Sequence, residues 1–293
     1  MISALLQANI PRLLHNAPDS TTAFKNAQRT TMLTERIDFP GPHGKISAKL
    51  DAPDGTPRAY GIFAHCFTCS KDVLAATHIA RGLASLGVAV LRFDFAGLGS
   101  SHGDFADTNF SSNVEDLVTA ADYLRDHYAA PQLLIGHSLG GAAVLAAAQR
   151  VPEARAVVTI AAPSDPHYVV NKLLSGHLDT IAREGEARVK LAGRDFNIRQ
   201  HFVEDAGSHQ LHEKIATLGR ALLVMQAPQD DTVSMDNATR IFELARHPKS
   251  FVSLDGMDHL ISRREDAAYV AGVISAWSAR YLGAQAETGA AHA

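Results

Sequence analysis

This sequence has few cysteines, no long apolar run and no excess of basic residues. Only two of the 293 residues are cysteine, so no second pair exists to complete a four-ligand zinc site. No stretch approaches the roughly 20 consecutive apolar residues of a membrane-spanning helix. Lysine and arginine total 27 against 31 acidic residues, a net charge of −4 that is unlike a nucleic-acid-binding protein. We therefore expect no bound metal, no membrane span and no nucleic-acid partner.

The two cysteines, Cys66 and Cys69, form a C-x-x-C pattern. This pattern can carry redox chemistry. Its place in a loop after a short apolar strand instead favours two reduced thiols that pack against the strand end. So few cysteines fit a reducing compartment, and we expect a cytoplasmic location.

Composition is ordinary for one globular domain, with 46% hydrophobic and 20% charged residues. Residues 1–30 lack the basic start and unbroken apolar centre of a secretory signal, although basic residues outnumber acidic ones there, as in a transit peptide. We interpret residues 1–30 as a poorly ordered N-terminal extension. Residues 31–283 are expected to form one domain, and residues 284–293 a flexible tail.

Strands and helices alternate along the domain. Residues 35–39 and 45–50 flank a turn and are expected to pair as antiparallel strands. The further expected strands are residues 59–65, 88–93, 133–135, 156–160, 221–226 and 250–254, and the expected helices are residues 73–86, 114–128, 140–150, 236–246 and 267–281. This alternation predicts an α/β protein with a mostly parallel eight-stranded sheet and helices on both faces.

One interval is too long for a single crossover. About sixty residues separate the strands at residues 156–160 and 221–226. Within it, residues 187–191 and 195–198 flank Ala-Gly-Arg and are expected to form a hairpin. We interpret residues 164–220 as a small cap over the carboxyl edge of the sheet.

The sharpest motif is G-x-S-x-G at residues 136–140, with Ser138 at its centre. It stands between a short buried strand and an alanine-rich helix, which is the context of a nucleophile elbow. Glycines on both sides of the serine let the strand turn sharply into the helix and expose the hydroxyl. The alternative is a glycine-rich turn with an ordinary serine, but chance matches at a strand–helix junction are rare. Ser138 is therefore the candidate nucleophile.

A serine hydroxyl needs a base, and the base needs an acid to orient it. His259 follows the last expected strand and Asp230 the strand before it, so both lie at carboxyl ends, where open α/β sheets build their sites. Asp231 is the local rival of Asp230. We interpret Asp255 and Asp258 as solvated loop carboxylates.

The negative charge of a tetrahedral intermediate requires N–H donors. One is expected from the backbone of Leu139, which follows the nucleophile at a helix start, where the helix dipole favours an anion. The other is expected from the backbone of Phe67, in the loop after the strand at residues 59–65. In a plainer interpretation, His65 and the cysteines of that loop only pack the strand end.

Several short motifs lie at matching places in one known group of proteins. They are His65-Cys-Phe-Thr, Lys71-Asp, Phe93-Asp-Phe-Ala-Gly-Leu-Gly-Ser-Ser, Ala162-Pro-Ser-Asp and Asp258-His-Leu, together with the G-x-S-x-G motif. From about residue 35 to residue 282 the sequence resembles the α/β-hydrolase superfamily, and more narrowly the bacterial hydrolases often fused to an OsmC-like domain.

The resemblance implies the α/β-hydrolase fold, with Ser138, Asp230 and His259 as a catalytic triad. It also implies Phe67 and Leu139 as the donors of an oxyanion hole. Most of the superfamily has glycine where this sequence has a cysteine after His65, although the narrower subgroup shares the cysteine. The sequence contains no OsmC-like domain, so peroxide-reducing chemistry is not carried over.

These residues favour a carboxylic-ester hydrolase that acts on a small-molecule ester through an acyl-enzyme and needs no metal or organic cofactor. The oligomeric state, and the choice among ester, thioester and lactone, are left open. One alternative is a serine peptidase of the oligopeptidase or dipeptidyl-peptidase type, against which the lack of propeller-like repeats counts. The other is a non-catalytic binding protein with a hydrolase fold, which typically lacks a triad member, whereas here each has a candidate.

Overall fold

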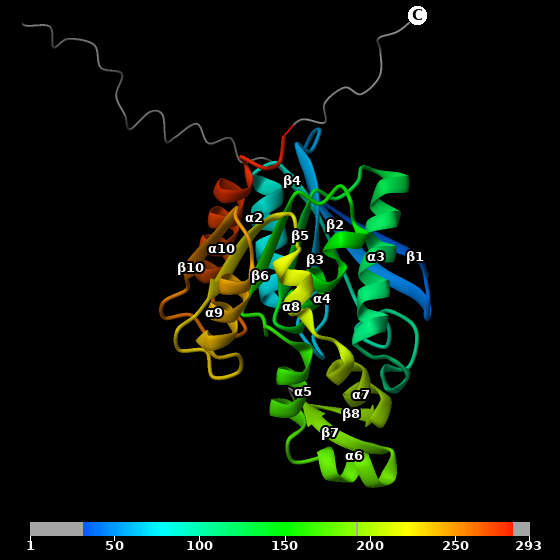
Figure 1. Cartoon of the computed structure of the whole chain (residues 1–293). Coiled ribbons are helices and arrows are strands. Elements are labelled where there is room, and N and C mark those ends of the chain that lie inside the picture. The colour runs from blue at the N-terminus through cyan, green and yellow to red at the C-terminus, as the bar shows by residue number, and fades with distance from the viewer. Residues whose placement is uncertain (1–31, 192, 284–293) are drawn as a thin grey trace, which may run out of the picture. The chain divides into compact units, whose positions relative to one another are not determined.

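The computed structural model describes residues 32–191 and 193–283. The expected extension at residues 1–30 and tail at residues 284–293 lie outside the described residues. Eight strands form one sheet in the order β1-β2-β4-β3-β5-β6-β9-β10 (Figure 1). Their bounds are β1 Met32–Gly41, β2 Gly44–Pro53, β3 Ala59–Ala64, β4 Val88–Phe93, β5 Leu133–His137, β6 Ala156–Ile160, β9 Ala221–Gln226 and β10 Lys249–Ser253.

The sheet is mostly parallel, as expected. β1 pairs antiparallel with β2, and β2 pairs antiparallel with β4. All other neighbouring strands are parallel. Parallel neighbours place their carboxyl ends at one edge of the sheet, so loops far apart in the sequence meet there.

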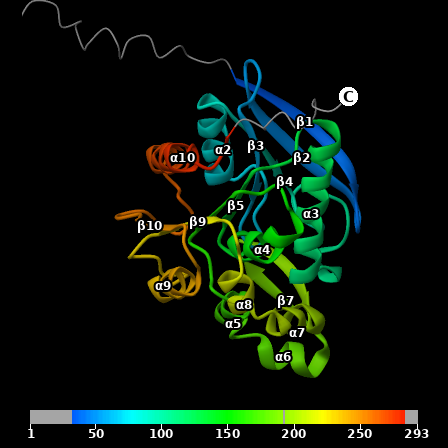
Figure 2. The same cartoon turned by 45° about the horizontal axis from the view of Figure 1, so that its top comes forward.

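Helices cover both faces of the sheet. α2 (Leu74–Ser85) and α10 (Arg264–Ser278) lie side by side on one face (Figure 2). α3 (Phe110–His127), α4 (Leu139–Ala147) and α9 (Met235–Leu244) belong to the apolar core on the other face. No helix in the described part of the chain is long and apolar enough to cross a membrane.

Successive side chains of a strand pack alternately into the two apolar cores, one on each face of the sheet. In β3, Ile62 belongs to the core under α3 and α4, and Phe63 to the core under α2 and α10. In β4, Leu91 and Val90 divide in the same way. All four side chains are fully buried, so apolar residues follow one another along these strands instead of alternating with polar ones.

α3 begins ahead of its expected start at residue 114. Asn109 caps it, because its side chain accepts the N–H of Ser112, while the Ser112 hydroxyl accepts the N–H of Asn109. This reciprocal capping box satisfies two N–H groups that a helix start leaves free. The expected start was placed from the spacing of apolar residues, and that spacing carries no information about a cap made by polar side chains.

A buried carboxylate of α3 lies under the loop after β4. Asp116 is fully buried, and its Oδ2 accepts the N–H of Ala96 at 2.8 Å. Its Oδ1 has no hydrogen-bond partner among the described residues. Burial disfavours the ionised form and raises the pKa of Asp116 to about 6.

This carboxylate should make stability depend on pH. The folded protein holds the proton more tightly than the unfolded chain, so ionisation of Asp116 costs stability as pH rises from about 4 to about 6. We expect Asp116→Asn, which keeps an oxygen for the Ala96 N–H, to raise the free energy of unfolding at pH 8 by about 1–3 kcal/mol. At pH 4 the two proteins should be nearly equal in urea unfolding. The same gain at both pH values would contradict the raised pKa.

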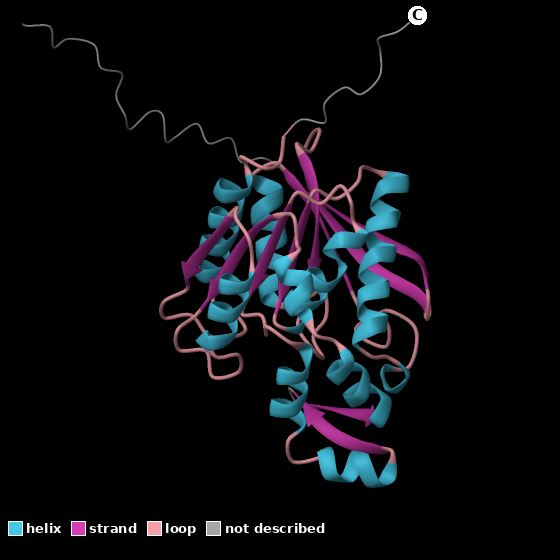
Figure 3. Cartoon of the chain, in the orientation of Figure 1, coloured by secondary structure: helices cyan, strands magenta, loops and turns pink. Residues whose placement is uncertain are grey.

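The segment between β6 and β9 contains the expected hairpin. Its elements are α5 Pro166–Leu174, α6 Leu178–Glu184, β7 Glu186–Leu191, β8 Arg194–Arg199, α7 Gln200–Ser208 and α8 Leu211–Ala216. β7 and β8 pair antiparallel as a separate two-stranded sheet. Figure 3 shows α5, α6, α7 and the hairpin beyond the arrowheads of the parallel strands, on the side of their carboxyl ends, whereas α8 returns to the body of the protein and packs against α4 and α9. We refer to residues 164–220 as the cap.

Aromatic rings join the cap to the body of the protein. Phe196 of β8 and Phe202 of α7 pack around Phe105, with ring centroids 5.0 and 6.1 Å away. Phe67 packs against both Phe105 and Phe202, at 5.7 and 5.3 Å. We call these four side chains the aromatic cluster. It gives the loop after β3 and the cap a shared packing surface.

Candidate active site

Ser138 lies at the turn between β5 and α4, with φ 54° and ψ −125°. A positive φ is uncommon for residues other than glycine. The turn is fixed on both sides, because the Ser138 N–H donates to Ile160 and the Ser138 carbonyl accepts from Gly141. This strained backbone points the side chain out of the strand and toward the loops at the carboxyl edge.

Two glycines make this turn sterically possible. A Cβ at Gly136 would lie 2.2 Å from the carbonyl oxygen of Gly140. A Cβ at Gly140 would lie 2.3 Å from the carbonyl oxygen of Ala64. Both neighbours are backbone atoms that cannot move aside, so any side chain at either position would force the strand, the turn and the helix apart.

Adding a methyl group in this turn should therefore be costly. We expect Gly136→Ala to lower the free energy of unfolding by about 3 kcal/mol or more, at the upper end of what overpacking costs. Gly176→Ala is the matched control, because nothing lies within 4 Å of a Cβ at that position. Thermal unfolding of both variants measures the difference. Equal midpoints would show that the elbow tolerates a side chain.

The structure brings Ser138, His259 and Asp230 together in one chain of hydrogen bonds. His259 Nε2 lies 3.1 Å from Ser138 Oγ, and His259 Nδ1 lies 2.8 Å from Asp230 Oδ2. An ionised carboxylate can only accept, so Nδ1 carries the proton and Nε2 is free to accept from the serine hydroxyl. The imidazole is thereby held in the tautomer that a base for Ser138 requires.

Asp230 is held as an ionised acceptor. Burial alone would raise its pKa, but the hydrogen bond and charge of His259, together with the N–H groups of Val233 and Thr232, outweigh it and lower the pKa of Asp230. Its Oδ1 accepts from both N–H groups at 2.8 Å, and its Oδ2 accepts from Gln226 at 3.1 Å. The carboxylate is therefore fixed in place before any substrate binds.

The other acidic candidates point elsewhere. Asp231 is exposed, and its carboxylate accepts from the neighbouring Thr232 hydroxyl. Asp255 and Asp258 are exposed as well. Asp165 accepts the N–H of His167 at the start of α5. Among these acidic residues, Asp230 makes the hydrogen bond to His259.

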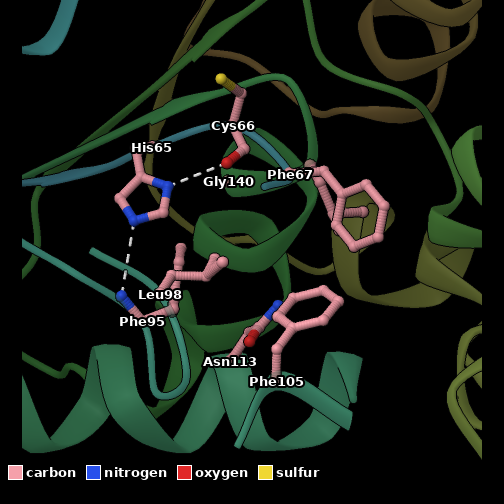
Figure 4. Close-up of a pocket in the computed structure, with 9 residues that line it drawn as sticks. His65, Cys66, Phe67, Phe95, Leu98, Phe105, Asn113 and Gly140 are labelled. Atoms are coloured by element: carbon pink, nitrogen blue, oxygen red, sulfur yellow. Dashed lines mark hydrogen bonds between the residues drawn. The ribbon is translucent and has the colours of Figure 1, made fainter. Parts of the chain in front are cut away.

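Phe67 and Leu139 line the same small cavity, of about 10 Å³, and Figure 4 shows Phe67 among the labelled residues around it. Leu139 is the first residue of α4, where N–H groups have no partner within the helix. Within residues 32–191 and 193–283, neither N–H has a hydrogen-bond partner. Two N–H groups without a partner, one of them directly after Ser138 at a helix start, suit a single anionic oxygen.

Sequence reasoning considered His65 only as a packing residue and missed its hydrogen bonds. Its Nε2 accepts the N–H of Phe95 at 3.4 Å, so Nδ1 carries the proton and donates to the Cys66 carbonyl at 2.8 Å (Figure 4). In a trans peptide the carbonyl and the next N–H point in opposite directions. Holding the Cys66 carbonyl therefore orients the N–H of Phe67. Burial lowers the pKa of His65, which favours this neutral form.

His137 supports the opposite side of the site, and no motif in the sequence predicted this role. It is buried, and its Nε2–H donates to the backbone carbonyl of His259 at 2.7 Å. Burial lowers the pKa of His137 to about 3, so the ring is neutral near pH 7. The residue before the nucleophile thus anchors the loop that carries the candidate base.

The expectation of two reduced thiols is wrong in this structure, which joins Cys66 and Cys69 by a disulfide. The loop folds into a tight turn in which the Cys69 N–H donates to the Cys66 carbonyl at 3.1 Å, and Thr68 has φ 59°. The turn brings the two Cα atoms to 5.3 Å, within the range that a disulfide spans. No group of three or more His, Cys, Asp or Glu in the described part of the chain could hold a metal ion.

Comparison with known proteins begins with a family model. Residues 56–217 match the family described as serine aminopeptidase, S33. The match covers the loop after β3, the elbow and most of the cap. An esterase domain of a Rhodothermus marinus protein is 45% identical in sequence, with a TM-score of 0.70. The alignment covers 86% of this chain and 100% of that domain.

More distant relatives include other hydrolases. A human mitochondrial palmitoyl-protein thioesterase is 28% identical over 172 residues, which are 54% of this chain and 53% of the relative. The chain thus spans about half the length of that curated relative. Mouse monoglyceride lipase is 25% identical over 72% of this chain and 78% of its own length.

Proposed function

Since the chain belongs to the hydrolase family described as serine aminopeptidase, S33, and has the α/β-hydrolase fold, we propose that it hydrolyses carboxylic esters through an acyl-enzyme on Ser138. The observation that carries this proposal is the hydrogen-bonded chain from Ser138 through His259 to Asp230. The 45% identity to an esterase domain supports the same class of substrate.

In the first half of the reaction, Ser138 Oγ attacks the ester carbonyl carbon while its proton passes to His259 Nε2. The carbonyl oxygen becomes an anion, which accepts from the N–H groups of Phe67 and Leu139. Asp230 keeps its hydrogen bond to Nδ1 and stabilises the imidazolium. His259 then gives the proton to the leaving alkoxide, the alcohol departs, and the acyl group stays on Ser138.

In the second half, water replaces the alcohol. His259 takes a proton from the water as its oxygen attacks the acyl carbon, and the same two N–H groups hold the new oxyanion. Collapse of this intermediate releases the carboxylic acid, and His259 returns its proton to Ser138 Oγ. The enzyme is restored without any cofactor entering a step.

The family's description favours a peptidase as the second candidate. An aminopeptidase binds the protonated amino terminus of its substrate, which calls for an acidic side chain near the nucleophile. An apolar pocket of about 320 Å³ adjoins the site, and none of its lining residues is acidic, whereas one of them is Arg194. This lining disfavours a free amino terminus and supports an ester.

Two narrower expectations belong with this proposal. One is membership of the bacterial subgroup often fused to an OsmC-like domain, for which the cysteine after His65 is the sequence argument. The other is a cytoplasmic location, although one relative of this chain is described as mitochondrial. Small-molecule esters, and not polymers, are the proposed substrates.

A fluorophosphonate probe and a matched substrate panel test the proposed function. We expect the probe to label Ser138 in peptide mapping. Among substrates with the same leaving group, short acyl esters of p-nitrophenol should be hydrolysed faster than long ones, and alanine p-nitroanilide much more slowly than the acetate. A thioester of the same acyl group completes the panel. Faster anilide cleavage would favour the peptidase, and no labelling would favour a non-catalytic binding protein.

A further inference from the structure

An apolar pocket lies between the two loops that carry the candidate base and one oxyanion donor. Cys66, Thr68 and Cys69, from the loop after β3, line it on one side, and Leu260 and Ser262, which follow His259, line it on another. The start of α2 and His137 complete its apolar wall, and β8 of the cap contributes Arg194. The pocket holds about 320 Å³, enough for one ring or a short chain.

The position of His259, the general acid of the proposed reaction, shows which part of the substrate this pocket receives. In the proposed reaction His259 protonates the leaving alkoxide, so the alcohol part of the ester must lie on the side of Nε2 and its loop. Leu260 and Ser262, directly after His259, line the pocket. The alcohol part is therefore the part of the substrate that this pocket can receive.

Arg194 differs from the other arginines of the hairpin. Arg188 pairs with Asp195, and Arg199 pairs with Glu186 and Asp107. Arg194 has no carboxylate partner among the described residues.

The guanidinium of Arg194 is nonetheless positioned. Its Nη2 donates to the Thr68 carbonyl, and its Cζ lies 5.2 Å from the centre of the Phe196 ring. A guanidinium has five N–H donors in a planar fork that matches a carboxylate. One edge of Arg194 holds the loop, and the exposed side chain also lines the pocket.

We propose, on the basis of the ester hydrolysis proposed above, that this pocket binds the alcohol part of the substrate and that Arg194 binds a carboxylate on it. The substrate class is then an ester whose leaving alcohol or phenol has a small apolar body that ends in a carboxylate. The apolar walls hold the body, and the fork of Arg194 forms charge-assisted hydrogen bonds with the acid.

Three acetate esters with related leaving groups test this assignment. They are meta-acetoxybenzoate, the neutral meta-acetoxybenzamide of nearly the same shape, and phenyl acetate. The measured quantity is the ratio of kcat/KM for the benzoate to that for the benzamide, in the parent and in Arg194→Gln, Arg194→Lys and Arg188→Gln. Because each variant is compared on the same two esters, their different intrinsic reactivities cancel between variants.

We expect the parent ratio to exceed that of Arg194→Gln by about tenfold, mostly through a lower KM for the benzoate, as one exposed ionic contact allows. Arg194→Lys should keep part of the preference, and Arg188→Gln, on the same hairpin, should keep all of it. If Arg194 only holds the cap to Thr68, its loss lowers kcat/KM equally for both esters. The ratio then stays unchanged, which overturns the proposal.

The outcomes separate this inference from the function on which it rests. If phenyl acetate is hydrolysed but the ratio is unchanged in Arg194→Gln, the carboxylate site is overturned and the proposed ester hydrolysis is not. No hydrolysis of any of the three esters, together with no fluorophosphonate labelling of Ser138, overturns both. Thermal unfolding of each variant shows that the ratios come from folded protein.

Discussion

Ser138→Ala should reduce ester hydrolysis by about four to six orders of magnitude and leave the fold intact. The substitution removes the atom that forms the covalent bond, and the remaining N–H groups of Phe67 and Leu139 supply only residual catalysis. Alanine carries the same backbone strain at φ 54° and forgoes one hydrogen bond, to His259. The free energy of unfolding should therefore stay within about 1 kcal/mol of the parent.

Single-turnover and steady-state assays with p-nitrophenyl acetate measure this loss, and fluorophosphonate labelling should disappear with it. Ser175→Ala is the control, because that exposed serine makes only a local hydrogen bond to the carbonyl of Lys172. It should keep full activity and full labelling. Activity of more than a few per cent in Ser138→Ala would assign the nucleophile to another residue.

Asp230→Asn should lower kcat by about four orders of magnitude, whereas Asp231→Asn should stay within about tenfold of the parent. The amide removes the charge that stabilises the imidazolium, and it can hold His259 in the wrong tautomer. Asp231 is a fair control because it is adjacent, has the same chemistry and is exposed.

The outcome of this pair is informative in each direction. The reverse ranking would transfer the role of the acid to Asp231 and keep the hydrolase assignment. Equal and mild losses would place the acid elsewhere, for example at Asp165, which here accepts the His167 N–H. Since the pKa of Asp230 is lowered, its ionisation should not limit activity near neutral pH, and the contrast should persist there.

Local hydrophobic pattern was enough to predict most of the fold. The expected strands at residues 88–93, 156–160 and 221–226 agree with β4, β6 and β9 at both ends. These strands are mostly apolar, and a glycine or an arginine directly before each of them (Gly87, Arg155, Arg220) marks its start in the sequence itself. The long interval after β6 revealed the cap for the same reason, because its length exceeds any single crossover.

What the sequence did not reveal depends on contacts between distant residues. His137 acts through a carbonyl 122 positions away, and Arg194 through one 126 positions away. The disulfide depends on the turn at Thr68, which spacing alone does not determine. In each of these cases the residue type is ordinary, and only its neighbours in space give it a role.

The aromatic cluster links catalytic rate to substrate scope, two properties that enzyme engineers usually try to vary separately. Phe67, whose N–H is a proposed oxyanion donor, packs its ring against Phe202 of the cap. A library that replaces Phe202 or Phe196 to widen substrate scope would also disturb the residue that supplies this N–H. Scope is better varied at positions that line the proposed substrate pocket but lie outside the cluster, such as Leu260 and Ser262. We expect natural substitutions in the aromatic cluster to be coupled in the same way, because each of them would alter the rate together with the selectivity.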